Sequence, residues 1–273
     1  MRLFVFGMGY TAGRVAERAG GAVASTSRDG REGTLRFDDE AAVRGALAGA
    51  THVLSSVPPQ GESDPVLARY CDALGGKWLG YLSSTGVYGD VGGAWVDESA
   101  PTGGGRRSAR AIADAAWAGL GARVFRLPGI YGPGRSAIER VLSGSAHRVH
   151  ASGQVFSRCH VDDIAAGVLA GFDAAPGAYN LADDLPADQN EVVAYAAALL
   201  GLPPPPFVPL SSLSAVAQGF YAENRRVANG KAKRVLGWRP LYPNYRLGLR
   251  ALSAITSPIA HTTAPAPARS DQR

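Results

Sequence analysis

The sequence is poor in cysteine and has no long apolar run. Its 273 residues include two cysteines, Cys71 and Cys159, and these do not resemble a disulfide framework or a metal site. No stretch is long and apolar enough to cross a bilayer. Strand-type residues begin at position 2, which leaves no room for a secretory signal ahead of the fold. We therefore expect a cytoplasmic protein with no membrane partner and no metal.

A strong charge of either sign is also absent. The chain has 28 lysines and arginines against 23 acidic residues, and part of the net charge of +5 lies between Arg225 and Arg239. This segment lacks the interleaved aromatic residues and the known motifs of nucleic-acid-binding proteins. We therefore expect no nucleic-acid partner. The basic residues instead indicate a solvated helix face or a site for an anionic substrate.

What remains is the composition of a globular enzyme, with 46% hydrophobic and 19% charged residues. Strand-type runs alternate with segments of helical spacing, which predicts a Rossmann-type, doubly wound parallel α/β sheet. The expected strands cover about 3–6, 22–26, 34–37, 52–56, 78–82, 123–127 and 178–181. The expected helices follow about 10, 39, 64, 106, 138, 189, 230 and 245, and Ser211-Ser212 is expected to cap another.

The first strand runs into a glycine-rich turn that is followed at once by a helix. Gly7-x-Gly9-x-x-Ala12 fits the dinucleotide-binding fingerprint in its alanine-ended form. The first glycine makes the tight turn, the second lets the backbone approach a pyrophosphate, and the small third residue lets helix and strand pack closely. The free N–H groups at the start of the helix would face the phosphates. We expect a dinucleotide to bind here, with contacts that include Tyr10 and Thr11.

The second strand ends at Ser27-Arg28-Asp29, about 20 residues after the glycines, where a Rossmann fold contacts the adenosine ribose. The guanidinium of Arg28, with Ser27 beside it, suits the 2′-phosphate of NADP. A carboxylate such as Asp29 suits the 2′-hydroxyl of NAD instead. The sequence therefore favours NADP and leaves NAD open. A solvated loop position for Arg28 is the simpler alternative.

Further motifs follow one another along the chain. They are Ser83-Ser84-Thr85-Gly86-Val87-Tyr88-Gly89, Val96-Asp97-Glu98-Ser99-x-Pro101, Arg126-Leu127-Pro128-Gly129-Ile130-Tyr131-Gly132-Pro133-Gly134, His160-Val161-Asp162-Asp163-Ile164-Ala165, Tyr179-Asn180-Leu181-Ala182 and Arg226-Val227-x-Asn229-x-Lys231-x-x-Arg234-x-Leu236-Gly237-Trp238. Together with the glycine turn, and in this order, they resemble the extended short-chain dehydrogenase/reductase family of NAD-dependent epimerases and dehydratases. The resemblance covers nearly the whole chain up to about Leu252 and is much more specific for fold and cofactor than for substrate.

The resemblance implies a Rossmann domain, residues 1–128 and about 156–180, beside a small and mostly C-terminal α/β substrate lobe, residues about 129–155 and 181–256. The composition of residues 257–273 predicts a disordered tail. The site is expected in the cleft between domain and lobe. The helix after Gly61 and the one near Arg106 resemble the pair through which relatives dimerise, which leaves a homodimer open.

The resemblance also assigns roles to single residues. It places Asp38 near the adenine, and Val57 and Pro58 near the adenosine ribose and pyrophosphate. Further cofactor contacts are expected at Ser56, Ser83 and Pro128, and substrate contacts at Thr85, Tyr131 and Arg158. Arg225 or Arg226 would contact a diphosphate, with surface salt bridges as the alternative.

One feature of the family is missing. Relatives carry a Tyr-x-x-x-Lys pair at the start of the helix that follows the Val-Tyr-Gly segment, and its tyrosine exchanges a proton with the substrate. The best register puts Arg106 at the tyrosine position and Arg110 at the lysine position, and no tyrosine lies between Tyr88 and Tyr131. Arginine stays protonated and cannot replace the acid–base residue. Arg110 can still hold the nicotinamide ribose.

Three hypotheses follow. In the first, the protein is an oxidoreductase or epimerase/dehydratase-like enzyme for a small carbonyl, hydroxyl or nucleotide-sugar-like substrate. Ser84 would then orient the substrate oxygen and Tyr88 would supply the proton, unless Tyr88 is a structural residue of its turn. In the second, the fold binds NADP(H) without turnover, as a redox or metabolite sensor. In the third it is a scaffold, against which the intact glycine turn and Arg28 argue. His160 is expected to be structural, at the start of a helix.

Overall fold

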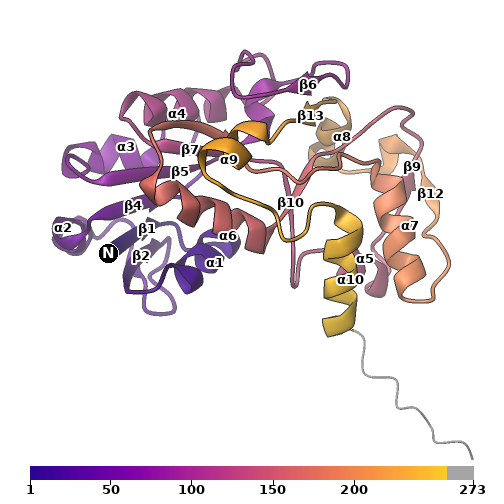
Figure 1. Cartoon of the computed structure of the whole chain (residues 1–273), viewed down its shortest axis with the longest axis horizontal. Helices are drawn as coiled ribbons and strands as arrows, with labels where there is room; N and C mark the ends of the chain where they lie inside the picture. The colour runs from indigo at the N-terminus through magenta and orange to yellow at the C-terminus, as the bar shows by residue number, and fades with distance from the viewer. Residues whose placement is uncertain (257–273) are drawn as a thin grey trace, which may run out of the picture.

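The computed structural model describes residues 1–256, and the expected disordered tail, residues 257–273, lies outside them. The chain forms a seven-stranded sheet with helices on both faces and a smaller lobe beside it (Figure 1). Neighbouring strands of this sheet are parallel, in the order β11-β7-β5-β4-β1-β2-β3. They are β1 (Arg2–Phe6), β2 (Ala22–Ser27), β3 (Leu35–Arg36), β4 (His52–Ser55), β5 (Trp78–Ser84), β7 (Arg123–Leu127) and β11 (Gly177–Asn180). The predicted doubly wound α/β fold is confirmed.

The pattern of side chains along β1 shows why both faces of the sheet are covered. Leu3 and Val5 belong to one hydrophobic core, whereas Phe4 and Phe6 belong to the other, because successive side chains of a strand point to opposite faces. All four are buried, as expected for a central strand of a parallel sheet. One face carries α1 (Tyr10–Ala19), α6 (Val161–Ala170) and α9 (Gly230–Val235), and the other carries α2 (Glu40–Gly49), α3 (Pro65–Tyr70) and α4 (Ser108–Gly119).

The order of the strands determines where a ligand can bind. The chain passes from β1 outward through β2 and β3, and then returns to the other side of β1 with β4. Connections therefore leave the carboxyl ends of β1 and β4 in opposite directions and open a crevice there. The glycine turn at Gly7 and the loop that begins at Ser56 lie at this point.

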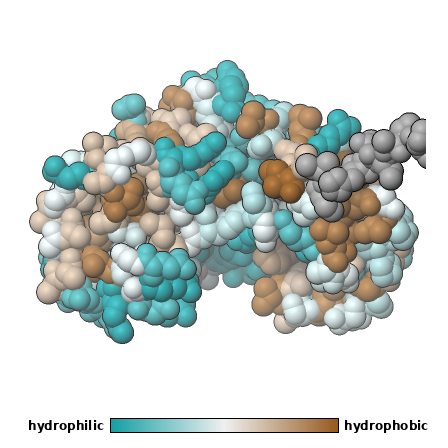
Figure 2. All heavy atoms as spheres, turned by 90° about the horizontal axis from the view of Figure 1, so that it is seen from below, coloured by the Kyte–Doolittle hydropathy of each residue, from teal (hydrophilic) through white to brown (hydrophobic). Residues whose placement is uncertain are grey.

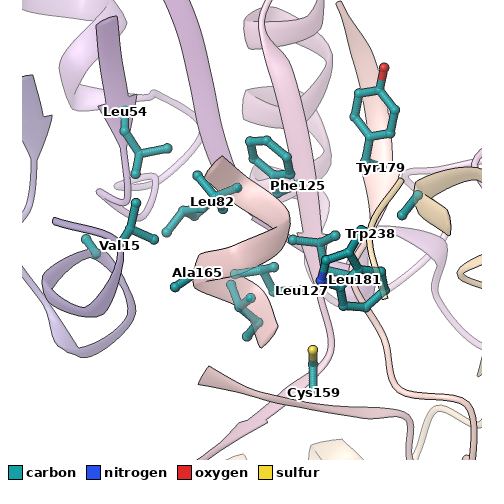
Figure 3. Packing of buried hydrophobic residues seen from close by; sticks show 14 of the residues in the cluster. Val15, Leu54, Leu82, Phe125, Leu127, Cys159, Ala165, Tyr179, Leu181 and Trp238 are labelled. Carbon is teal, nitrogen blue, oxygen red and sulfur yellow. The ribbon is translucent and has the colours of Figure 1, made fainter. Parts of the chain in front are cut away.

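The core on the first face is built around α6 (Figure 3). Ala165 of this helix packs in one cluster with Leu82 and Phe125 of the sheet. Trp238, which follows α9, joins the same cluster, and its indole Nε1 donates a hydrogen bond to the carbonyl of Asp163 at 2.9 Å. The C-terminal segment thus returns to the sheet at this point. The expected boundaries between domain and lobe stay a prediction.

The core on the second face contains a buried aromatic stack. Trp117 of α4 lies flat on Tyr81 of β5, with ring centroids 5.4 Å apart. Its Nε1 donates to Asp64 Oδ2 at 2.9 Å. The other carboxylate oxygen of Asp64 accepts the N–H groups of Val66 and Leu67 at the start of α3. One buried carboxylate therefore fixes two helices relative to each other.

A buried polar network connects α4 to the sheet. Arg126 of β7 donates to both carboxylate oxygens of Asp114, at 3.1 and 2.8 Å, and to the Tyr88 hydroxyl at 3.0 Å. Ser83 Oγ donates to Asp114 at 2.6 Å, and the Tyr88 hydroxyl donates to Asn180 Oδ1 at 2.7 Å. Burial alone would lower the pKa of Arg126, but the bonds with Asp114 raise it above its usual value.

The smaller lobe has its own apolar core. Ile138, Ala196, Tyr245 and Leu249 are its most buried members. The face in Figure 2 is hollowed between the bulk of the sheet domain and the bulk of the lobe.

No helix within residues 1–256 has the length and apolarity that a bilayer span requires. The remaining helices are α5 (Ala137–Leu142), α7 (Gln189–Leu199), α8 (Ala215–Tyr221) and α10 (Tyr245–Thr256), and paired short strands are β8 (Gly129–Tyr131) with β10 (Arg158–His160), β9 (Arg148–Val149) with β12 (Phe207–Val208), and β6 (Trp95–Val96) with β13 (Arg226–Val227).

One predicted helix cap is wrong. Ser211 and Ser212 lie in a short 3₁₀ turn, Leu210–Ser212, and do not begin the next helix. That helix, α8, is capped by Ser214, whose side chain accepts the N–H of Ala217 at 3.3 Å. Serine is a good cap at any of these positions, so the local pattern could not distinguish them.

His160 has the structural position expected for it. It is the N-cap of α6, and its Nδ1 accepts the N–H of Asp162 at 3.2 Å. Its ring lies between Tyr131 and Tyr242, with centroids 5.1 and 4.3 Å away. Burial lowers the pKa of His160 to about 4, so the imidazole is neutral in the folded protein.

Replacing Asp114 with Asn should strongly destabilise the fold. The variant leaves the Arg126 guanidinium buried without its countercharge, which costs about 3 to 5 kcal/mol. Urea unfolding measures the change. Asp72→Asn is the matched control, because Asp72 pairs with Arg44 at the same 2.8 Å but is largely exposed, and such pairs contribute about 0 to 1 kcal/mol. Similar losses in both variants would contradict the importance of the buried pair.

The burial of neutral His160 should make stability depend on pH. The unfolded chain takes up this proton near pH 6.5 and the folded protein only near 4, so acidification between these values favours unfolding. The free energy of unfolding should fall across this window in the wild type and fall less in His160→Asn, which keeps a capping oxygen. Denaturant unfolding at a series of pH values measures both slopes, and equal slopes would refute the assignment.

Candidate functional site

A cavity of about 750 Å³ separates the sheet domain from the lobe, and we call it the cleft. Its floor is formed by the start of α1, the end of β5 and the start of α4, and the lobe closes it from the other side. Of the predicted site residues it is lined by Gly9, Tyr10, Thr11, Ala12, Ser56, Ser83, Ser84, Thr85, Arg110, Pro128, Arg158 and Arg225. The structure therefore brings together most of the residues that the sequence assigned to one site.

The glycine turn has the geometry that its sequence predicts. Gly7 has a φ of +79°, and a Cβ there would lie 3.1 Å from Val57 Cγ2 and 3.2 Å from Ser56 Oγ. Ser56 Oγ also donates to the Gly7 carbonyl at 2.5 Å, so the loop after β4 is held against the turn. Gly9 is different, because a Cβ there would meet no protein atom within 4 Å. The space beside Gly9 opens into the cleft, where a pyrophosphate needs it.

Two helices that begin at the cleft, α1 and α4, have no side-chain cap, a state that they share with α9 outside it. Side chains cap α2, α3, α5, α6, α7 and α8. The N-caps of α1 and α4, Gly9 and Arg107, make no such bond, and neither helix has an acidic residue in its first turn. Both helix ends therefore leave their positive dipole ends free for an anion in the cleft.

The end of β2 presents Arg28 to solvent. Arg28 is exposed, and its guanidinium has no hydrogen-bond or ion-pair partner among residues 1–256. Ser27, by contrast, is buried and used by the protein itself, because its Oγ accepts the N–H groups of Gly30 and Arg31 at 2.9 and 3.2 Å. Ser27 thus shapes the loop that carries Arg28.

Asp38 and Pro58 lie outside the cleft. Asp38 forms an exposed ion pair with Arg36 at 2.9 Å, and it lines a second hollow of about 760 Å³ with Gln60 and Arg69. This hollow lies between the loops after β3 and β4, the position at which the resemblance puts the adenine. Pro58 is exposed in the loop after β4.

The end of β5 and the residue after it bring three hydroxyl groups to the cleft. Ser83 gives its hydroxyl hydrogen to Asp114. Ser84 Oγ accepts the N–H of Gly86 at 3.1 Å, and its own hydrogen has no protein acceptor among the described residues. Thr85 is buried beside them. Ser84 can therefore donate a hydrogen bond to a ligand in the cleft.

Tyr88, the predicted acid, lies outside the cleft. Its side chain is only 4% exposed and does not line the cleft. The hydroxyl donates to Asn180 and accepts from Arg126, and burial raises the pKa of the phenol. These contacts favour the alternative that the sequence left open, a structural role for Tyr88 in its turn.

Two predicted substrate residues also lie outside the cleft. Tyr131 belongs to the core of the lobe, packs against Gly248 and is absent from the cleft. Arg226 donates to the Gly93 carbonyl at the β6–β13 pair and does not line the cleft. Both side chains follow the alternation of short strands, whose register the sequence pattern did not resolve.

The predicted lobe arginines that do reach the cleft are held by the protein. Arg158 is buried, which lowers its pKa, and it donates to the carbonyls of Phe156 and Ala187 at 2.8 and 3.0 Å. Arg225 donates to the Gly89 carbonyl at 2.7 Å and to Glu223 Oε2 at 3.0 Å. Both guanidinium groups thus take part in fixing the lobe.

The strongest feature of the cleft is one that the sequence did not reveal. Among the described residues that line it, seven are arginines and one, Glu223, is acidic. The arginines not predicted are Arg106, Arg107, Arg135 and Arg140. They come from separate segments with no shared spacing, so only the folded chain shows that they converge. The resulting positive potential favours anionic ligands.

Comparison with known proteins identifies structures that share this fold. No protein-family model matches the chain. A conserved protein of unknown function from Silicibacter pomeroyi is 42% identical, with a TM-score of 0.85 and 93% of this chain and 98% of that chain covered. UDP-glucose 4-epimerase from Thermus thermophilus, in a complex with NAD, is 22% identical with a TM-score of 0.73, and 93% and 98% are covered. A human epimerase family protein with NADPH is 16% identical with a TM-score of 0.72, and 93% and 99% are covered.

A curated protein adds a match in sequence. A 3-diazoavenalumate denitrifying reductase from a Streptomyces species is 33% identical over 151 residues, which are 51% of this chain and 49% of that protein. The match thus spans about half the length of that reductase. The likenesses below 25% identity establish the fold, and the Silicibacter pomeroyi protein matches over almost its full length. The chain therefore belongs to one family with the Silicibacter pomeroyi protein, and it shares the fold of the NAD-dependent epimerases and dehydratases.

Proposed function

We propose that the protein is an NADP(H)-dependent oxidoreductase that acts on a small substrate without the Tyr-x-x-x-Lys dyad. The observation that carries this proposal is the cleft itself. The uncapped glycine corner and the free Ser84 hydroxyl open into one cavity, so a dinucleotide and a substrate would meet there. The dinucleotides named with the fold neighbours and the reductase activity named for the curated relative support it.

The residues present fit a dinucleotide. Gly9 and the first N–H groups of α1 would receive the pyrophosphate, and the exposed Arg28 would receive a 2′-phosphate. Arg110 would hold the nicotinamide ribose, and Pro128 borders the same part of the cleft. Arg110 already donates to the Tyr81 hydroxyl at 2.8 Å, a bond that holds its side chain at this wall. The bound cofactor would supply or accept a hydride.

The replaced dyad limits the reaction classes. Reduction of a carbonyl develops negative charge on oxygen, which Ser84 can stabilise by donating a hydrogen bond. Among the described residues of the cleft, no tyrosine stands at the family's position to protonate that oxygen. The curated relative's name describes loss of nitrogen from a diazo group. Replacement of N₂ by hydride on a diazonium carbon breaks C–N, forms C–H and needs no proton, so it suits such a site.

One observation favours the second hypothesis, an NADP(H) sensor without turnover. Both dyad positions hold arginine, and Tyr88 is committed to the protein core. A screen for NADPH oxidation with carbonyl compounds, nucleotide sugars and aryl diazonium salts separates the two. Tight NADPH binding with no turnover of any of these would support the sensor. The expected homodimer and cytoplasmic location stay predictions.

Arg28→Gln should change the choice of cofactor. Losing a charge-assisted contact with the 2′-phosphate should weaken NADPH binding by about 10- to 100-fold and leave NADH binding nearly unchanged. Fluorescence titration with each dinucleotide measures both. Arg31→Gln is the matched control, since Arg31 is an exposed arginine of the same loop. Wild-type protein that binds NADH more tightly than NADPH would refute the role of Arg28.

Tyr88→Phe should lower stability and spare turnover. The variant removes one hydrogen-bonded hydroxyl from the buried network, which should lower the free energy of unfolding by about 1 to 2 kcal/mol.

Ser84→Ala removes the hydrogen-bond donor in the cleft and should lower kcat by about 100-fold. Steady-state rates with a substrate found in the screen, beside urea unfolding, test both variants. A fully folded Tyr88→Phe protein without activity would restore Tyr88 as the acid.

A further inference from the structure

Arg107 differs from Arg106, Arg110 and Arg225 in having no hydrogen-bond or ion-pair partner within residues 1–256, a state that it shares with Arg135 and Arg140 elsewhere in the cleft. Arg106 lies 3.5 Å from Glu223, Arg225 lies 3.0 Å from the same carboxylate, and Arg110 bonds Tyr81. The Arg107 guanidinium has no hydrogen bond or ion pair with any residue between 1 and 256. It is nonetheless half-buried in the wall of the cleft. A half-buried charge without a partner is costly unless a ligand supplies one.

The surroundings of Arg107 increase this cost. Burial lowers the pKa of Arg107, and the positive charges of Arg106, Arg110 and Arg225 lower it further, against the opposite effect of Glu223. Glu223 is also shared between Arg106 and Arg225. The cluster therefore holds more positive charge than its single carboxylate can balance. An incoming anion would relieve the repulsion.

The position of Arg107 puts this unbalanced charge next to Ser84. A Cβ on Gly86 would lie 2.6 Å from Arg107 Cδ, 3.2 Å from Arg107 Nε and 3.2 Å from Ser84 Oγ. The guanidinium nitrogen and the serine oxygen are thus both adjacent to one point. Their separation is at most about twice 3.2 Å, which a single small molecule can span.

We propose that the substrate is a small organic acid whose carboxylate pairs with Arg107 while its reacting atom lies at Ser84. This inference rests on the proposed function and adds the chemical class of the substrate. The family resemblance put an anionic group on Arg225 or Arg226 in the lobe, but those side chains are bound to protein atoms. The anion site therefore lies on the sheet domain, at the N-cap of α4.

The neighbouring surface suits the rest of such an acid. Leu213, Ala217 and Phe220 line the same cleft as Arg107. The Phe220 ring lies 4.5 Å from the Arg106 guanidinium and 5.7 Å from that of Arg107. An apolar or aromatic body can pack on this wall while its carboxylate forms a two-pronged bond with the guanidinium.

Calorimetric titration of the full-length protein, saturated with NADP⁺, tests the proposal. Benzoate is the probe, and benzamide is its uncharged counterpart. Benzoate should bind at least about tenfold more tightly than benzamide, because only the carboxylate makes a charge-assisted bond. Equal affinities would overturn the proposal. Inorganic phosphate is titrated as well, and phosphate binding more tightly than benzoate would overturn the assignment to carboxylates.

Variants then locate the site. Arg107→Gln should lose at least about tenfold in benzoate affinity, with NADP⁺ affinity unchanged, and Arg107→Lys should retain part of the binding because it keeps the charge. Arg140→Gln removes the same charge from another wall of the cleft. An equal loss in Arg140→Gln would show that only the general field of the cleft attracts anions, and would refute the site at Arg107.

A cofactor-free titration separates this proposal from the proposed function. If NADP⁺ does not bind but the affinity for benzoate still depends on Arg107, then the proposed function fails and the anion site stands. If NADP⁺ binds and benzoate affinity is the same in wild type and Arg107→Gln, the anion site fails alone. Circular dichroism of each variant confirms that the comparison is between folded proteins.

Discussion

The buried pair of Asp114 and Arg126 constrains most of the functional part of this molecule. Burying two charges is expensive, and the pair is tolerated because Ser83 and Tyr88 complete its hydrogen bonds. Asp114 belongs to α4 and Arg126 to β7, so the pair fixes the helix on the sheet. The register of α4 then determines which side chains of its first turns reach the cleft. The charged core and the chemistry of the cleft are therefore linked through one helix.

The same pair explains why the family's catalytic phenol cannot simply have moved to Tyr88. Its hydroxyl completes the coordination of Arg126 and bonds Asn180 of the outermost strand β11. Turning the ring toward the cleft would leave a guanidinium and an amide unsatisfied in the protein interior. The Tyr88 hydroxyl is therefore bonded within the protein interior and is not available to a substrate in the cleft.

The sequence predicted what depends on neighbouring residues and missed what depends on packing. The glycine turn, the alternation of strands and helices along the chain, and the N-cap position of His160 follow from local patterns. The structure agrees with all three. The hydrogen bonding of the Tyr88 hydroxyl depends on Asn180, which lies 92 positions away in the chain. The convergence of Arg107 with Arg140 and Arg225 likewise has no periodic signal. Motif matching therefore located the cleft but could not give its charge.

That charge bears on both functional hypotheses. Like charges crowded around Arg107 raise the free energy of the empty cleft, so any anion that enters lowers it and stabilises the protein by mass action. An enzyme would use this gain to hold an acid beside the hydride position, and a sensor would use it to report occupancy. The first physical step, neutralisation of the arginine cluster, is the same. What distinguishes the two is only whether the reacting atom of the bound acid lies at Ser84, within reach of the nicotinamide.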